Sequence, residues 1–168
     1  MVVLHDLITE LEKTPVSVGT LKDTVPDYVH VYSYKELEGK SRNDLFRKAK
    51  AIIVLIPKKG EKMGHFVALI PWKTHIEYFS SLGNSFEKEL SMLGQTNHIQ
   101  RVVGKHYIYN RTALQSGKYN IRTCAYFVLA RVKLHKMKLR QFVQIFQSTL
   151  QLSNPDEIVS LLTLFSFI

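Results

Sequence analysis

The sequence predicts an α+β fold in which a central, mostly antiparallel sheet packs against helices. Apolar residues recur at strand spacing between residues 51 and 80, and at helical spacing before and after that stretch. This order, with helices first, strands in the centre and helices last, is typical of the α+β class. The 168 residues are 45% hydrophobic and contain no repeat, low-complexity tract or Gly/Ser linker, so we expect one domain spanning residues 1–168.

Two short helices are predicted before the strands. Residues 3–13 carry apolar side chains at helical spacing, whereas residues 14–26 contain two prolines and a glycine and are expected to be irregular. Ser41 lies three residues before Asp44 and can cap a short helix that runs through Ala49.

Four segments are predicted as strands. Residues 51–57 (AIIVLIP) form a continuous apolar run, as expected of a strand buried on both faces. Residues 65–72 (HFVALIPW) and 75–80 (HIEYFS) are expected to pair through a short turn, and residues 100–109 are predicted as a further strand.

Helices are predicted again after the strands. Residues 123–135 and 138–150 each have apolar residues at helical spacing. A last helix is expected to begin with Asn154 as its N-cap, Pro155 at the first helical position and Glu157 three residues after the cap.

Charge and cysteine content narrow the function classes. Lys and Arg number 23 against 14 Asp and Glu, and this net charge of +9 predicts attraction to polyanions. The single cysteine excludes an internal disulfide and a Cys-rich zinc site. No apolar stretch approaches the ~20 residues that span a bilayer, and the first residues lack the features of a signal peptide. We therefore expect a soluble protein of a reducing compartment with no membrane partner.

Three residues can together carry out acyl transfer. Cys124 begins a long apolar helix, where the helix dipole and unpaired N–H groups favour a thiolate. His65 begins a strand after a Gly-containing turn, and Gln115 lies in the polar loop before Cys124, where its amide can face a developing oxyanion. Taken singly, each has a structural reading as well: a small buried hydrophobe, a structural or surface histidine, and a polar loop residue.

Three segments in order, GHFVALIPW, IEYFSSLG and LQSGKYNIRTCAYFVL, resemble the characteristic blocks of the adenain-like and SUMO-protease-like cysteine proteases. Upstream, SVGTLKDTVPDYV is similar to the Gly-Thr…Pro segment of the adenovirus maturation proteases. The resemblance covers residues 15–135 and is greatest to the maturation proteases of virophages and polinton-like viruses. It implies a papain-like, adenain-like architecture, cleavage of viral capsid precursor proteins at small or Gly-rich sites, and a location in the virion and in the viral factory of the host-cell cytoplasm.

The same resemblance implies a role for each site residue. Cys124 matches the nucleophile of the family, His65 its general base and Gln115 its oxyanion donor. Phe66 stands where the family usually has Trp. The acid that normally orients the histidine falls on Ser80, which carries no charge, and the loop from Gln115 to Cys124 is longer than in the family.

The missing acid has three candidate replacements. Glu77 is the carboxylate nearest to Ser80 in sequence, but residues three apart on a strand point to opposite faces. Ser80 can instead accept a hydrogen bond from the imidazole and hold its tautomer. We therefore predict a Cys–His dyad assisted by Ser80, with Asn84 as a weaker candidate for that role.

The densest basic run contains four residues that we call the basic cluster: Lys133, Lys136, Lys138 and Arg140. We expect this cluster to bind DNA without sequence preference and in a salt-sensitive way, with DNA as a candidate non-covalent stimulator. A second basic run lies between residues 58 and 62. A solvated helix end and a solvated turn are the alternative readings of the two runs. No metal and no other cofactor is expected.

The expected function is a cysteine endopeptidase that processes capsid precursor proteins. Two alternatives stay open. One is a deconjugating protease for ubiquitin-like modifiers, although so short a chain leaves little room for a surface that recognises a folded modifier. The other is a basic DNA- or capsid-binding protein that has lost catalysis, for which Ser80 is the main support.

Overall fold

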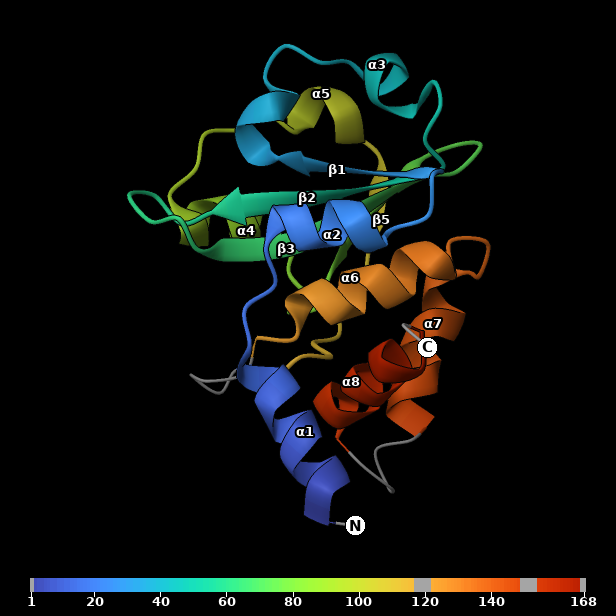
Figure 1. Cartoon of the computed structure of the whole chain (residues 1–168). Coiled ribbons are helices and arrows are strands. Elements are labelled where there is room, and N and C mark those ends of the chain that lie inside the picture. Colours follow the sequence, from blue (N-terminus) through green and yellow to red (C-terminus); the bar gives the residue numbers. More distant parts are fainter. Residues whose placement is uncertain (1, 117–121, 149–153, 167–168) are drawn as a thin grey trace.

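A five-stranded sheet with helices on both faces organises the chain (Figure 1). The structure is a computed structural model and describes residues 2–116, 122–148 and 154–166. The strands follow the sequence order across the sheet: β1 (Val29–Ser33), β2 (Ala51–Pro57), β3 (Gly64–Pro71), β4 (Ile76–Ser80) and β5 (Tyr107–Tyr109). The predicted α+β class is confirmed.

The sheet is mixed rather than mostly antiparallel. The central strands β2, β3 and β4 pair antiparallel, as expected of segments joined by short turns. The outer pairs, β1 with β2 and β4 with β5, are parallel. Parallel neighbours need a crossover connection, and the helices that separate these strands in sequence provide it.

Eight α-helices and one 3-10 helix (η1) lie within the described residues. They are α1 (Val2–Lys13), α2 (Val18–Thr24), η1 (Tyr34–Leu37), α3 (Arg42–Phe46), α4 (Phe86–Leu93), α5 (Gln100–Val103), α6 (Cys124–Lys133), α7 (Leu139–Ser148) and α8 (Pro155–Ser166). The predicted caps are in place: Ser41 accepts a hydrogen bond from the Asp44 N–H, and Asn154 accepts one of 3.0 Å from the Glu157 N–H.

Two segments differ from the sequence predictions. Residues 100–109 are not one strand, because Gly104, with φ of 77°, ends the short helix α5 before the three-residue strand β5. Residues 14–26 are not irregular throughout, since Ser17 caps α2. Strand β1 and helix α4 were not identified in the sequence, and the last two residues of the helix predicted for 138–150 lie outside the described residues.

Apolar residues bury both faces of the sheet. Along β3, Phe66, Ala68 and Ile70 belong to the core shared with α6 and α7, whereas Val67 and Leu69 belong to the core shared with α4 and α5. This alternation is the two-residue period of a strand. The predicted burial of residues 51–57 on both faces is confirmed. Within the described part of the chain, no helix is both long enough and apolar enough to cross a bilayer.

Candidate active site

His65 is the second residue of β3, and a close chain approach determines its place. A Cβ atom on the preceding Gly64 would lie 2.0 Å from the carbonyl oxygen of Ile56 on β2, so only glycine fits there. This close approach holds the start of β3 against β2, at the position next to His65. The His65 side chain is buried, with 7% of its surface exposed.

Cys124 is the first residue of α6 and is partly buried. The helix packs against β3, and the first residues of both elements line the same cleft. The backbone N–H groups of Phe66, on β3, and of Ala125, in the first turn of α6, lie near enough to the Cys124 sulfur to lower the pKa of the thiol. The predicted position at a helix N-terminus is therefore the observed one, and the positive end of the helix dipole adds to these donors.

The thiol and the imidazole shift each other's pKa in opposite directions. Burial acts to raise the pKa of Cys124, but the hydrogen bond and charge of His65, with the two backbone donors, outweigh it and lower the pKa. Burial likewise acts to lower the pKa of His65, yet the bond to Cys124, the charge of Cys124 and the charge of Glu89 raise it. Both shifts favour a thiolate–imidazolium pair at neutral pH.

Ser80, the last residue of β4, makes the predicted contact with the histidine. Its Oγ lies 3.1 Å from Nε2 of His65, which leaves Nδ1 as the ring nitrogen for Cys124. The same Oγ donates to Oε2 of Glu89 over 2.8 Å and accepts from the Leu82 N–H over 3.3 Å. Asn110, just after β5, holds the Ser80 backbone in place by donating to its carbonyl and accepting from its N–H.

Glu89 is a site residue that sequence reasoning missed. It lies on α4 and has 1% of its surface exposed. Its Oε1 is 3.8 Å from Nε2 of His65. The sequence does carry a signal for it: Phe86, Leu90 and Leu93 form the apolar face of α4, and Glu89 lies on that face. A carboxylate on the buried face of a helix requires a partner.

Glu77 has no part in this cluster. It lies on the opposite face of β4 and is buried in an ion pair with Arg131 of α6, with 2.6 Å between Oε1 and Nε. The Trp72 indole also donates to it, over 3.0 Å. Asn84 donates to the sulfur of Met92 at 3.7 Å. The strand-alternation argument against Glu77 thus agrees with the structure.

Gln115 lies beside Cys124 and His65 in one cleft. Its backbone N–H donates to the Ser81 carbonyl over 3.0 Å, and its Oε1 accepts from the Ser81 hydroxyl over 2.7 Å. This contact directs the side chain, and with Oε1 as the acceptor the amide nitrogen is its donor end. Most of the loop from Gln115 to Cys124, whose length sets it apart from the family, lies outside the described residues.

Asp156 is a second residue that the sequence did not reveal. This buried carboxylate, near the start of α8, accepts a hydrogen bond of 2.8 Å from the Ser116 N–H and another from the Thr123 hydroxyl. Ser116 follows Gln115 and Thr123 precedes Cys124. One carboxylate thereby anchors both ends of the loop that supplies the amide and the thiol.

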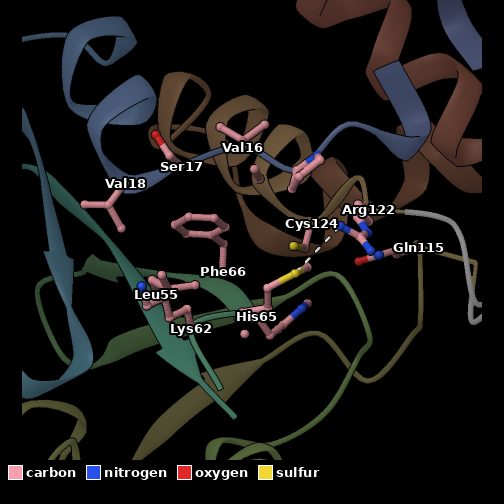
Figure 2. A pocket seen from close by; sticks show the side chains of 14 residues that line it. Val16, Ser17, Val18, Leu55, Lys62, His65, Phe66, Gln115, Arg122 and Cys124 are labelled. Carbon is pink, nitrogen blue, oxygen red and sulfur yellow. Dashed lines mark hydrogen bonds between the residues drawn. The ribbon is translucent and has the colours of Figure 1, made fainter. Parts of the chain in front are cut away.

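The cleft above the sulfur has a volume of about 380 Å³ (Figure 2). Val16 and Val18 lie near the Phe66 ring, and residues 15–18 contribute to the lining of the cleft. Two cations, Lys62 and Arg122, also line it, and Arg122 donates to the sulfur of Met63 at 3.7 Å. An extended peptide can enter between an apolar wall and a basic rim.

The basic cluster lies at the other end of α6 from Cys124 and continues into α7. Lys136, Lys138 and Arg140 are exposed, and Lys133 is half-buried. Lys133 and Lys136 line a groove with Tyr28 and Lys50, and the Lys50 ammonium is 5.6 Å from the centre of the Tyr28 ring. None of the four residues of the cluster lines the cleft that holds Cys124 and His65.

The structure thus brings four of the predicted site residues together: Cys124, His65, Ser80 and Gln115. Among the residues described, no group of three or more His, Cys, Asp and Glu side chains is arranged to hold a metal ion. A scan of the sequence against models of protein families found no match, and a search among curated proteins found none either.

Proposed function

We propose that the protein is a cysteine endopeptidase in which Cys124 is the nucleophile and His65 the general base and acid. The observation that supports this most is the pairing of a thiol in the first turn of a helix with a buried imidazole. Each group favours the charged form of the other, at the floor of a cleft that can hold a peptide. An inert structural cysteine has no such partner.

The residues of the site supply each step of acyl transfer. The Cys124 thiolate attacks the scissile carbonyl carbon, and the developing oxyanion is held by the Gln115 amide and by the backbone N–H at the start of α6. His65 gives its Nδ1 proton to the leaving amine. It then takes a proton from the water that hydrolyses the thioester and returns the sulfur to its starting state. Ser80 keeps the Nε2 proton in place throughout.

We propose capsid precursor proteins as the substrates, cut at small or Gly-rich sites, in the virion and the cytoplasmic viral factory. This assignment is supported by the resemblance of residues 15–135 to virophage and polinton-like maturation proteases. DNA bound along the basic cluster is the proposed stimulator, because the exposed cations there form a surface separate from the cleft.

The test is incubation of the protein with the capsid precursor encoded beside it, followed by mass measurement of the fragments. The wild type is expected to produce two defined fragments, and Cys124→Ala none. Cleavage by Cys124→Ala at the wild-type rate would refute the proposal. A fusion of a ubiquitin-like modifier to a reporter, cut in preference to the precursor, would favour a deconjugating protease instead.

The reading as a protein that has lost catalysis depended on the missing charge at position 80. Glu89 lies directly behind Ser80 and supplies a carboxylate to the same cluster. This arrangement favours an active enzyme over a relic.

A further inference from the structure

We propose that Glu89 is the acid of this site and that it acts on His65 through the hydroxyl of Ser80. Glu89 is thus a positioning residue, since the hydroxyl lies between it and the imidazole. The inference rests on the proposed peptidase function. It assigns the missing charge to a helix that follows β4, at a place in the chain where the sequence blocks of the family have no acid.

The hydrogen bonds of Ser80 determine the direction of the relay. A serine hydroxyl has one proton to donate and two lone pairs that accept. The proton goes to Oε2 of Glu89, which as a carboxylate can only accept. One lone pair accepts from the Leu82 N–H, so the other must accept from Nε2–H of His65. Glu89 therefore selects the tautomer that leaves Nδ1 for the thiol.

The burial of Glu89 supports this role. A leucine at this position would extend the apolar face of α4 without any cost of removing a charge from water. The carboxylate instead lies with 1% of its surface exposed, bonded to Ser80 and 3.8 Å from the imidazole. Its negative charge compensates the imidazolium that forms when Cys124 loses its proton.

The surrounding charges come from several elements. Cys124 on α6 faces the imidazole. The pKa of Tyr78 on β4 is raised, first by burial and then by the nearby negative charge of Glu89. Lys62 and Arg122 line the cleft on the solvent side. Within the described residues, Glu89 is the carboxylate whose charge acts on His65.

The lone cysteine allows a direct test. Alkylation of Cys124 by iodoacetate, an anion that the imidazolium attracts, is followed by intact mass across the pH range, alongside peptidase kinetics, for wild type, Glu89→Gln and Ser80→Ala. The glutamine keeps the shape and an acceptor for Ser80 but removes the charge. Glu87→Gln is the matched control, because Glu87 is exposed on the same helix.

The expected result is a change in the pH profile. In Glu89→Gln the imidazolium loses its compensating charge and gives up its proton at lower pH. The alkaline limb of the iodoacetate profile, where the rate falls because that proton is lost, therefore moves to lower pH. The kcat falls about 10- to 100-fold, as for loss of a hydrogen bond to a charged group, and KM stays near its wild-type value. Ser80→Ala is expected to move the limb in the same direction, and Glu87→Gln leaves it unchanged. A purely structural role for Glu89 would lower the folded fraction without moving the limb.

Two outcomes separate this inference from the proposed function. An unshifted alkaline limb in folded Glu89→Gln, with wild-type peptidase activity intact, refutes the role of Glu89 alone. A shifted limb in Glu89→Gln, together with a wild type that cuts no peptide, refutes the function and retains the relay. Should Glu89→Gln fail to fold, Ser80→Ala decides, because it breaks the relay while leaving the carboxylate in place. An unshifted limb in that variant overturns the inference.

Discussion

Replacing His65 with alanine tests the central feature of the site. The variant removes the hydrogen bond and positive charge that lower the pKa of Cys124, while the N–H donors of Phe66 and Ala125 remain. Burial then prevails, and the pKa of the thiol rises. A thiol of ordinary pKa is only a few per cent ionised near pH 7, whereas a thiol of lowered pKa is ionised to a larger fraction.

The magnitude follows from the thiolate fraction. A decrease from complete ionisation to a few per cent sets an upper limit of about 30-fold on the loss of alkylation rate at pH 7. A thiolate of higher pKa is intrinsically more nucleophilic, which recovers part of that loss. We therefore expect a net decrease of about 10- to 30-fold. The difference should narrow as pH rises, because the variant thiol then ionises as well.

The assay is the rate of iodoacetamide addition at Cys124, read as a single mass adduct per chain. His106→Ala is the matched control, since His106 is exposed and distant in sequence from both reacting groups. Its rate should equal that of wild type. A folded His65→Ala protein that reacts as fast as wild type near pH 7 would show that the imidazole does not activate the thiol, and the mechanism proposed above would be wrong.

Three further predictions concern the oxyanion, the core and the basic surface. Gln115→Ala is expected to lower kcat by about 10²–10³ while iodoacetamide reactivity stays near wild type, because the amide acts on the oxyanion rather than on the thiolate; a matching loss of alkylation would contradict this. Arg131→Met leaves the buried Glu77 without its cation and is expected to lower the free energy of unfolding by about 3–5 kcal/mol in urea titrations, whereas an unchanged midpoint would mean that Trp72 alone satisfies the carboxylate. With four phosphate contacts, the affinity of the wild type for DNA is expected to fall roughly 100-fold between 50 and 200 mM salt, and replacing all four residues of the basic cluster with Gln should abolish this binding. Equal salt slopes for the two proteins, measured by fluorescence anisotropy, would exclude the cluster as the DNA-binding site.

Local patterns in the sequence accounted for much of the fold. The continuous apolar run at 51–57 predicted strand β2, buried on both faces, with its observed bounds, and Asn154 and Pro155 predicted the start of α8. These signals succeed because a strand buried on both faces and a capped helix start each depend on neighbours within a few residues. The direction of the outer strand pairs depends instead on crossovers, and no local period reports it.

The residues of the site also divide into those that a local pattern predicted and those that depend on tertiary packing. Strand alternation was enough to separate Glu77 from Ser80, since the two-residue period is a property of one strand. The partner of Ser80 was beyond such reasoning, because nothing in the period of α4 states which face of the sheet that helix covers. Asp156 lies far along the chain from the loop that it anchors, and only packing of α8 brings them together.

The chain alone therefore determined the chemical types at the site: one thiol at a helix start, one imidazole at a strand start, and an uncharged residue where an acid was expected. Tertiary packing decided how these groups are paired and charged. Hydrogen bonds and charge interactions act over a few ångströms, so their partners are chosen by how α4, α6 and α8 pack around the sheet. This is why Glu89 could be identified as the partner of Ser80 only from the tertiary structure.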